Sequence, residues 1–326
     1  MTGLPRNTIL IGDAAEGLRE LPSSSIDCVI TSPPYYQLRN YQVPGQIGLE
    51  GNVDGWVTAL RPVFAEVARV LKPTGVLWLN LGDSFSRHQR YGAPPKGLLL
   101  APERLLLALA ADGWIVRNKV IWAKTNPLPS SATDRLALTY EVVYFLVRAP
   151  RYFFDLDAIR EPHRSSAAKR ARPPLNLTPD WAGPLAATLG GLRRARAAGT
   201  PGHPLGKNPG DVWQIATHGY KGAHFATFPG ALVRRPLLAT CPQAVCSGCG
   251  RPWKRKANLL VPCGCGASTR PGVVLDPFFG SGTVGVAAQK LGRDWIGIEI
   301  NPAYVRLAEA RLADVSEQRV TLEAAA

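Results

Sequence analysis

The sequence predicts an α/β fold built on a doubly wound, mostly parallel sheet. Short apolar runs typical of buried strands alternate along the chain with stretches that have helical spacing. Several of the apolar runs end in polar or glycine-containing turns, as strands do at the carboxyl edge of such a sheet. The length of 326 residues is enough to bury one large core and to carry an inserted or appended element.

The amino-terminal half supplies most of the expected strands. The run Asn7 to Ile11 ends at a Gly-Asp pair, and the run Ile26 to Ile30 ends at a Thr-Ser-Pro-Pro-Tyr segment. The stretch Trp56 to Leu71 has apolar residues at helical spacing and stops at Lys-Pro-Thr-Gly. These patterns predict strands at 7–11, 26–30, 76–81, 114–122 and 140–147, and helices at 14–21, 56–71 and 98–111.

The carboxyl-terminal part contains a strand, a glycine turn, a helix and a second strand in close succession. A strand at 273–275 leads into the segment Asp276 to Thr283, a helix is expected at 284–291, and a strand at 295–299 ends in an acid. Such a unit holds an adenosine-bearing cofactor, because the glycines admit its backbone and the acid reaches ribose hydroxyls. The spacing from Gly280 to Glu299 is close to the roughly 20 residues that this arrangement requires.

The segment Thr31 to Tyr35 forms a rigid edge where a buried strand ends. Its two prolines fix φ near about −65° and supply no N–H, so the carbonyl groups of Ser32 and Pro33 can point outward beside an aromatic ring. Such an edge suits a planar amine. A lone segment of this kind could also be a simple rigid turn, and its pairing with the glycine unit favours catalysis.

At these two stretches the chain resembles the amino-methylating DNA methyltransferases, which transfer a methyl group from S-adenosylmethionine to cytosine N4 or adenine N6. The catalytic motif precedes the cofactor motif, as in the circularly permuted β group with an SPPY motif. The resemblance extends over most of the chain and fades between about 151 and 207. It implies a Rossmann-like methyltransferase fold, S-adenosylmethionine as cofactor and double-stranded DNA as partner.

The resemblance also implies the residues of the site. The catalytic motif comprises Ser32, Pro33, Pro34 and Tyr35. The cofactor site comprises Asp13, Thr31, His224, Phe228, Pro229, Asp276, Phe278, Phe279, Gly280, Ser281, Gly282, Thr283, Glu299 and Asn301.

Several of these acids and aromatic residues also have a structural interpretation. In the family, the acid that corresponds to Asp13 accepts a hydrogen bond from the adenine amine of the cofactor, but Asp13 could equally cap the following helix. Asp83, after the strand at 76–81, could face the site or cap a turn. Phe228 and Pro229 border the methionine end of the cofactor in the family, and they could also be packing residues.

The resemblance implies a direct transfer to a flipped base. The target would leave the duplex and stack on Tyr35, while Ser32 Oγ and the Pro33 carbonyl accept hydrogen bonds from its amine. Serine at this position is associated with cytosine N4, which is the preferred target, with adenine N6 as the alternative. Carbon-5 methylation needs a cysteine in a Pro-Cys-Gln context, and here Cys263 is followed by glycine.

A formal charge of +14 and a pI near 9.8 favour a polyanionic partner, although many proteins are merely basic. Arginine is concentrated between 151 and 209, where little apolar periodicity is present apart from a helix expected at 181–198. This segment is either a target-recognition region or a flexible basic insertion that touches only phosphates. The expected division is a catalytic half at 1–150, this region at 151–209, and a cofactor-binding half at 210–326.

Four of the six cysteines form two close pairs inside a knuckle expected at 241–266. Two thiolate pairs separated by a short loop can complete the tetrahedral shell of a structural zinc ion, and reduced, metal-free thiols are the alternative. Cys241 could substitute as a ligand, whereas Cys28 lies in an apolar strand and is expected in the core. The expected metal ligands are Cys246, Cys249, Cys263 and Cys265.

No stretch is apolar and long enough to span a bilayer, and the amino terminus lacks the features of a secretory signal, so a cytoplasmic protein is expected.

Three other classes of protein share some of these sequence features. The glycines also fit a nicotinamide-dependent oxidoreductase, but the Asp-Pro-Phe-Phe and Thr-Ser-Pro-Pro-Tyr segments argue against it. A non-catalytic zinc and nucleic-acid binding protein would bind DNA without the cofactor, and a protein-glutamine methylase usually has Asn in place of Ser32. A homodimer and a cognate restriction endonuclease are open partners.

Overall fold

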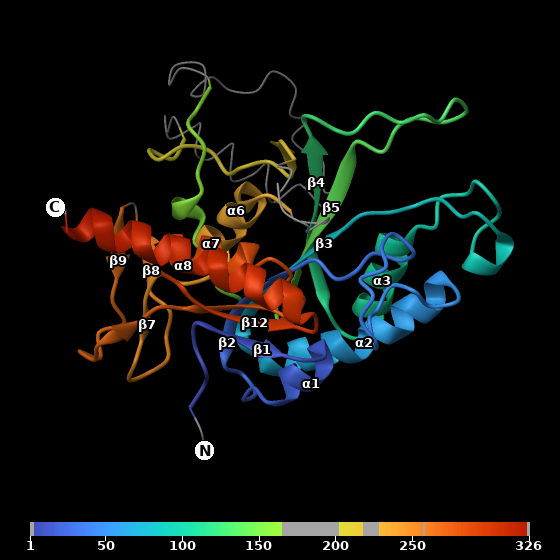
Figure 1. Ribbon diagram of the computed structural model, residues 1–326. Coiled ribbons are helices and arrows are strands. Elements are labelled where there is room, and N and C mark those ends of the chain that lie inside the picture. The colour runs from blue at the N-terminus through green and yellow to red at the C-terminus, as the bar shows by residue number, and fades with distance from the viewer. Residues whose placement is uncertain (1–2, 165–201, 218–227, 257, 325–326) are drawn as a thin grey trace.

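Strands from both halves of the sequence form a single eight-stranded sheet (Figure 1). The computed structural model describes residues 3–164, 202–217, 228–256 and 258–324. The order is β1-β12-β11-β2-β3-β5-β4-β6, and every neighbouring pair is parallel except the two pairs that involve β5. The strands are β1 (Thr8–Ile11), β2 (Ile26–Thr31), β3 (Leu71–Leu81), β4 (Ile115–Lys124), β5 (Tyr140–Val147), β6 (Val212–Ile215), β11 (Val273–Asp276) and β12 (Asp294–Glu299).

Helices cover both faces of this sheet, so the predicted doubly wound α/β fold is confirmed. Each face buries its own cluster of apolar side chains, and each cluster contains residues of the helices that pack there. One face carries α1 (Ala14–Arg19), α2 (Val53–Val70) and α3 (Ala101–Ala111), and the other carries α6 (Gly230–Thr240), α7 (Thr283–Lys290) and α8 (Pro302–Ala324).

Local signals account for where these elements begin and end. Asn52 caps α2, because its side-chain oxygen accepts a hydrogen bond from the backbone N–H of Gly55 at 2.7 Å. The strand expected at 76–81 begins earlier, at Leu71, where it pairs with β2. Asp83 accepts from the backbone N–H groups of Leu100 and Ala101 at the start of α3. The capping interpretation of Asp83 is therefore confirmed.

The two ends of the predicted recognition region meet in a short antiparallel bridge. The backbones of Glu161 and Lys207 exchange hydrogen bonds of 3.0 and 2.8 Å, and the Glu161 carboxylate also binds Arg235 of α6 at 2.9 Å. The helix expected at 181–198 lies outside the described residues. The boundaries at 150 and 209 stay predictions, although β6 pairs with β4 and so joins the two outer segments in one sheet.

The cysteine-rich segment is a small satellite between α6 and β11. It contains two strand pairs, which lie at the left of Figure 1. Cys241 does not belong to it, because this side chain is fully buried in the core on the α6 face, as is Cys28. The suggestion that Cys241 substitutes as a metal ligand is therefore wrong. The paired strands are β7 (Val245–Cys246) with β10 (Thr269–Arg270), and β8 (Lys254–Lys256) with β9 (Leu259–Val261).

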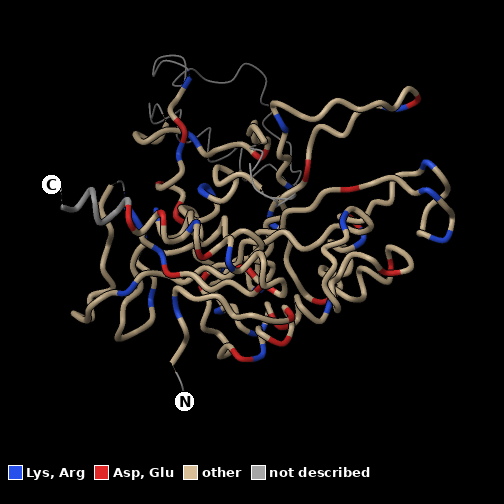
Figure 2. The backbone as a smooth tube through the Cα atoms, viewed as in Figure 1, with Lys and Arg blue, Asp and Glu red and all other residues tan. Residues whose placement is uncertain are grey.

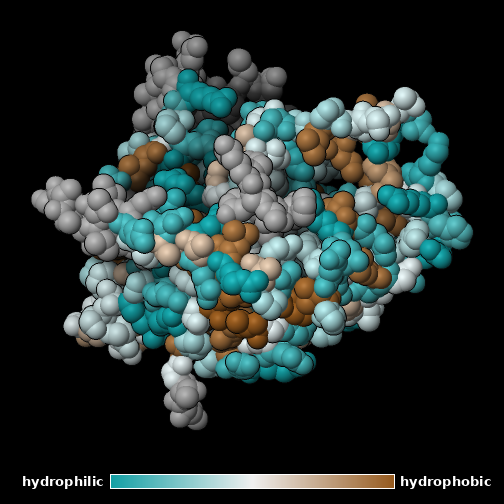
Figure 3. Space-filling model, viewed as in Figure 1, coloured by the Kyte–Doolittle hydropathy of each residue, from teal (hydrophilic) through white to brown (hydrophobic). Residues whose placement is uncertain are grey.

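Two loops extend from the carboxyl ends of β3 and β4 and carry Lys and Arg side chains (Figure 2). An ion pair of 2.6 Å between Lys96 and Asp134 joins them, and the Arg135 guanidinium lies 3.8 Å from the centre of the Phe85 ring. The face shown in Figure 3 mixes hydrophilic and apolar residues. Within the described ranges, no helix has the length and apolar character to cross a bilayer.

Candidate active site

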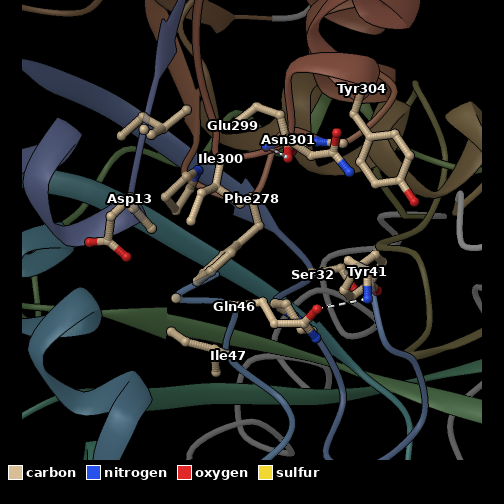
Figure 4. Close-up of a pocket in the computed structure, with 17 residues that line it drawn as sticks. Asp13, Ser32, Tyr41, Gln46, Ile47, Phe278, Glu299, Ile300, Asn301 and Tyr304 are labelled. Atoms are coloured by element: carbon tan, nitrogen blue, oxygen red, sulfur yellow. Dashed lines mark hydrogen bonds between the residues drawn. The ribbon is translucent and has the colours of Figure 1, made fainter. Parts of the chain in front are cut away.

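A cavity opens where β1, β2, β11 and β12 end. Its position is the crevice that ligands occupy in open α/β sheets. In Figure 4 the Phe278 ring lies between Asp13 on one side and Ser32 on the other. The lining comprises Gly12, Asp13, Ala14, Ser32, Pro34, Tyr41, Gly45, Gln46, Ile47, Pro277, Phe278, Gly280, Ile298, Glu299, Ile300, Asn301 and Tyr304.

Glu299 places a buried carboxylate at the edge of this cavity. Its two oxygens accept hydrogen bonds from the backbone N–H groups of Gly280 at 2.7 Å and Asn301 at 2.8 Å. Burial raises the pKa of Glu299 above its ordinary value, and these N–H donors act in the opposite direction. Each oxygen keeps acceptor capacity for a further donor, so the side chain is positioned for a diol of a ligand.

Asp13 caps the following helix, and it also lies in the wall of the cavity. Its carboxylate caps α1, because Oδ1 accepts from the backbone N–H groups of Ala15 at 2.8 Å and Glu16 at 3.1 Å. The same residue lines the cavity. Capping therefore fixes the carboxylate at the place where a ligand amine could donate to it.

Asp276 lies beneath the cavity rather than in its wall. Its carboxylate accepts from the Thr31 hydroxyl at 2.7 Å and from the Phe278 backbone N–H at 3.0 Å. Both Asp276 and Thr31 are buried, and burial raises the pKa of Asp276 to about 7. The pair ties β11 to β2 and orients the turn that carries the Phe278 ring.

The second half of the glycine turn points away from the cavity. The Phe279 ring stacks on Trp295 at 5.3 Å and lies against Gly297, where a Cβ atom would approach the ring to 2.3 Å. The guanidinium of Arg311 on α8 donates to the Ser281 hydroxyl and, at 3.3 Å, to that of Thr283. Phe279, Ser281, Gly282 and Thr283 are absent from the lining, so they support the turn from below.

Ser32 stands at the end of a polar network that the sequence did not reveal. The Ser32 hydroxyl lies 3.2 Å from that of Tyr35, which lies 2.7 Å from a Glu141 oxygen. Asn80 donates to the same oxygen at 3.1 Å, and Lys124 donates to the other Glu141 oxygen at 2.7 Å. The network joins β2, β3, β4 and β5 at one edge of the sheet.

The direction of these hydrogen bonds follows from charge and distance. Burial and the neighbouring Glu141 carboxylate raise the pKa of Tyr35 well above its ordinary value, so the phenol keeps its proton. Its single proton goes to the nearer, charged acceptor Glu141. The Tyr35 oxygen then accepts from Ser32, which leaves the lone pairs of Ser32 Oγ available to the cavity.

The remaining residues of the catalytic motif hold this edge in place. The Pro34 carbonyl accepts from the indole N–H of Trp56 on α2 at 2.9 Å, and Trp56 is almost completely buried. Pro33 is itself buried, and among the described residues no donor bonds to its carbonyl oxygen. Ser32 and Pro34 line the cavity, whereas Pro33 and Tyr35 are absent from its lining.

The structure adds one wall that sequence reasoning missed. Tyr41, Gln46 and Ile47 line the cavity from the loop after the catalytic motif, and the Gln46 side-chain oxygen accepts from the Tyr41 backbone N–H at 2.8 Å. The loop has no apolar periodicity from which its role could be predicted.

Three predicted cofactor residues are not found in this cavity. Phe228 packs against the core on the α6 face, and neither Phe228 nor Pro229 lines the cavity. His224 lies outside the described residues.

Comparison with known proteins places these features in a family. The family model for DNA methylases of the N6/N4 class matches residues 26–310. The chain belongs to this DNA methylase family. The type II methyltransferase M.XycI of Xanthomonas campestris pv. cyanopsidis is 36% identical to this methylase over 341 residues, which cover 98% of this chain and 92% of the relative. M.Cfr9I of Citrobacter freundii, also a type II methyltransferase, is 34% identical over 340 residues, covering 98% and 91%.

Solved structures share the fold of this methylase. The PvuII DNA methyltransferase, described as cytosine-N4-specific, superposes with a TM-score of 0.60 at 19% identity and covers 96% of this chain and 91% of that one. A putative DNA modification methylase of Thermus thermophilus, solved with S-adenosyl-L-methionine, superposes with a TM-score of 0.54 at 24% identity, covering 94% and 95%. At these identities the likeness concerns the fold alone.

Proposed function

We propose that this DNA methylase transfers a methyl group from S-adenosylmethionine to the exocyclic N4 of cytosine in double-stranded DNA. We also assign it to the permuted β group, because the Ser-Pro-Pro-Tyr edge comes before the glycine turn in the chain. The observation that carries the proposal is the junction of two halves in one cavity. The Ser32 hydroxyl lies on one side, and the carboxylates of Glu299 and Asp13 lie on the other, where they support an adenosine site.

The residues present fit the cofactor. Glu299 has acceptor capacity for ribose hydroxyls, Asp13 can accept from an adenine amine, and Phe278 and Ile300 supply an apolar wall beside them. When bound, S-adenosylmethionine would supply an electrophilic methyl group on a sulfonium. The carboxylates of Glu299 and Asp13 would also complement the positive charge of that ligand.

The chain's own contribution to the reaction is orientation and charge stabilisation. Ser32 Oγ and the Pro33 carbonyl accept the two N–H bonds of the target amine, which holds the nitrogen lone pair in line with the methyl group. As methylation proceeds, positive charge develops on the nitrogen, and the same two acceptors stabilise it until one N–H proton passes to water. The Glu141 carboxylate reinforces the Ser32 hydroxyl through Tyr35.

The target base must leave the duplex to reach these acceptors, at a cost of a few kcal/mol. Tyr35 is the proposed platform on which the base stacks. Its hydroxyl is anchored by Glu141, and its ring lies against Gly82, where a Cβ atom would approach the ring to 2.7 Å. The platform is therefore fixed at both ends before the base arrives.

The choice of cytosine N4 rests on Ser32, since serine in this motif is associated with that amine in the family. Adenine N6 is the alternative, because a neutral hydroxyl can accept from either amine. The acceptor geometry and the direct transfer are the same in both cases.

Double-stranded DNA is the proposed partner, and the loops at the carboxyl edge are the proposed contact surface. Arg87 and Arg90 are exposed on the loop after β3, and Leu128 and Leu136 are each 90% exposed on the loop after β4. Basic side chains contact phosphates, while apolar side chains can fill space that a flipped base vacates. A recognition role for 151–209, a homodimer and a cognate endonuclease stay predictions.

Replacement of Ser32 by alanine tests this assignment. We expect Ser32→Ala to lose most methyl transfer to unmethylated DNA while the dissociation constant for S-adenosylmethionine, measured by calorimetry, stays unchanged. Ser25→Ala is the matched control, because Ser25 lies just before β2, at the opposite end of that strand, and its hydroxyl donates to the Pro22 carbonyl. Full activity in Ser32→Ala would show that the proposed amine acceptor is wrong.

A further inference from the structure

Four cysteine side chains converge in the satellite between α6 and β11. Their sulfur atoms all lie within 4.8 Å of one another, and three of them surround the fourth. Cys265 Sγ is 3.1 Å from Cys246 Sγ, 3.0 Å from Cys263 Sγ and 3.5 Å from Cys249 Sγ. These distances are too long for a disulfide, in which the sulfurs are about 2.0 Å apart.

Two tight turns bring the pairs together. Cys246 and Cys249 flank one turn, Cys263 and Cys265 flank the other, and β7 pairs with β10 so that Cys246 lies opposite Thr269. The glycine that follows each pair, Gly250 or Gly266, has φ of +69°, a conformation that glycine adopts without a steric penalty. The sequence thus provides the backbone that two adjacent thiolate turns require.

A hydrogen bond beside the first turn holds β7 and β10 together. The Ser247 hydroxyl donates to the Ser268 carbonyl at 2.7 Å. This contact fixes the backbone next to Cys246, which lies on β7.

We propose that Cys246, Cys249, Cys263 and Cys265 bind one structural Zn²⁺ ion. Four sulfurs at about 2.3 Å from a central zinc lie roughly 3.8 Å apart, which falls between the shortest separation of 3.0 Å and the 4.8 Å that includes all four. A complete shell of four thiolates leaves no open position for substrate or water, so the ion has no catalytic role. The four cysteines are also absent from the lining of the active-site cavity.

The ion adds to the few buried apolar side chains of this satellite, such as Val245. The β8–β9 hairpin lies between the two cysteine pairs, and Leu259 on it is 76% exposed. A segment this small cannot bury enough apolar surface to hold its shape alone. The zinc ion therefore fixes the hairpin, whose Arg255 faces Asp155 of the main body at 3.5 Å.

Metal content of the full-length protein tests the proposal directly. Protein expressed with added zinc and purified without chelators is examined by native mass spectrometry and elemental analysis. We expect one zinc per chain in the wild type, and less than a tenth of that in Cys263→Ser. Cys241→Ala is the matched control, since it removes a thiol outside the cluster and should keep one zinc. Zinc retained by Cys263→Ser, or iron in place of zinc, would overturn the assignment.

A second measurement uses only the wild-type protein, so it does not depend on the folding of a variant. Iodoacetamide labelling with mass spectrometry should leave Cys249 and Cys265 unmodified in native protein, although both side chains are exposed. Prior treatment with a strong zinc chelator should make them react. Rapid alkylation of both residues without chelator would mean that the thiols are metal-free.

Discussion

The Tyr35 hydroxyl donates a 2.7 Å hydrogen bond to the Glu141 carboxylate, and this contact connects the catalytic motif to the antiparallel strand β5. Glu141 is in turn held by Lys124 on the neighbouring strand β4. The network therefore makes the proposed acceptor role of Ser32 depend on Glu141, which lies 106 positions after Tyr35 in the chain. It also keeps the Tyr35 proton away from the cavity.

Tyr35→Phe should lower kcat by about tenfold to a hundredfold, because Ser32 loses the partner that orients its hydroxyl. The dissociation constant for S-adenosylmethionine should not change, since the phenol does not line the cofactor side. Tyr36→Phe is the matched control: it removes one hydroxyl from the next residue, which is fully buried and takes no part in the Tyr35–Glu141 network. Equal activity of the two variants in a steady-state methylation assay would contradict the proposed role.

Asp276→Asn should stabilise the fold at neutral and alkaline pH. Burial raises the pKa of Asp276 to about 7, so the charged form is disfavoured in the folded state. Below the unfolded-state pKa of the carboxyl group, Asp276 is neutral in both states and contributes its full stability. This contribution is lost as pH rises through about 7, because the unfolded state releases the proton more readily than the folded state. Asparagine can still accept from Thr31, and it carries no charge. We expect a gain of about 1–3 kcal/mol in the free energy of unfolding near pH 8, and none near pH 3, in denaturant titrations. A gain that is equal at both pH values would show that the carboxylate is not the cause.

Glu299→Gln should weaken S-adenosylmethionine binding at least tenfold, or about 1.4 kcal/mol. One carboxylate oxygen is replaced by an NH₂ group, which cannot accept from Gly280 or from a ribose hydroxyl. Glu16→Gln is the control, because Glu16 is an exposed acid in the first turn of α1. Calorimetric titration with the cofactor measures both. An unchanged affinity in Glu299→Gln would remove this side chain from the cofactor site.

Arg87→Ala should weaken DNA binding in a way that depends on salt. If Arg87 contacts one phosphate, its loss should reduce the slope of the logarithm of the binding constant against the logarithm of salt concentration by about one. Arg19→Ala is the control, since Arg19 is an exposed arginine in the last turn of α1, away from the carboxyl edge of the sheet. Fluorescence anisotropy over a series of salt concentrations gives both slopes. An identical change for the two variants would indicate only a general effect of net charge.

Seven of the eight strands in the central sheet, and the ends that carry chemistry, could be predicted from the sequence, whereas the edge strand β6 was not predicted. Ser32, Asp276 and Glu299 each follow or end an apolar run, and the parallel order of the strands brings them to one edge. The position of Asp13 at the end of β1 could also be predicted, because an acid that follows a strand and caps the next helix must lie at that edge of the sheet. These are local signals, so one sequence is enough to find them.

The residues that the sequence did not reveal depend on long-range pairing. Glu141 reaches Tyr35 only because β5 runs antiparallel to β3 in one particular register. Phe279 stands inside a family motif, yet it packs on Trp295 because Gly297 leaves room for its ring. Neither outcome can be obtained from periodicity or composition, since both require the three-dimensional neighbours of a residue.

The most direct test of the central claim is the identity of the methylated base. Purified protein is incubated with methyl-labelled S-adenosylmethionine and mixed genomic DNA, and the digested nucleosides are analysed by mass spectrometry. We predict labelled N4-methylcytosine, which Ser32→Ala should fail to produce. Labelled N6-methyladenine would keep the acceptor mechanism and correct the base. Absence of label from DNA, in protein that binds the cofactor, would contradict the account.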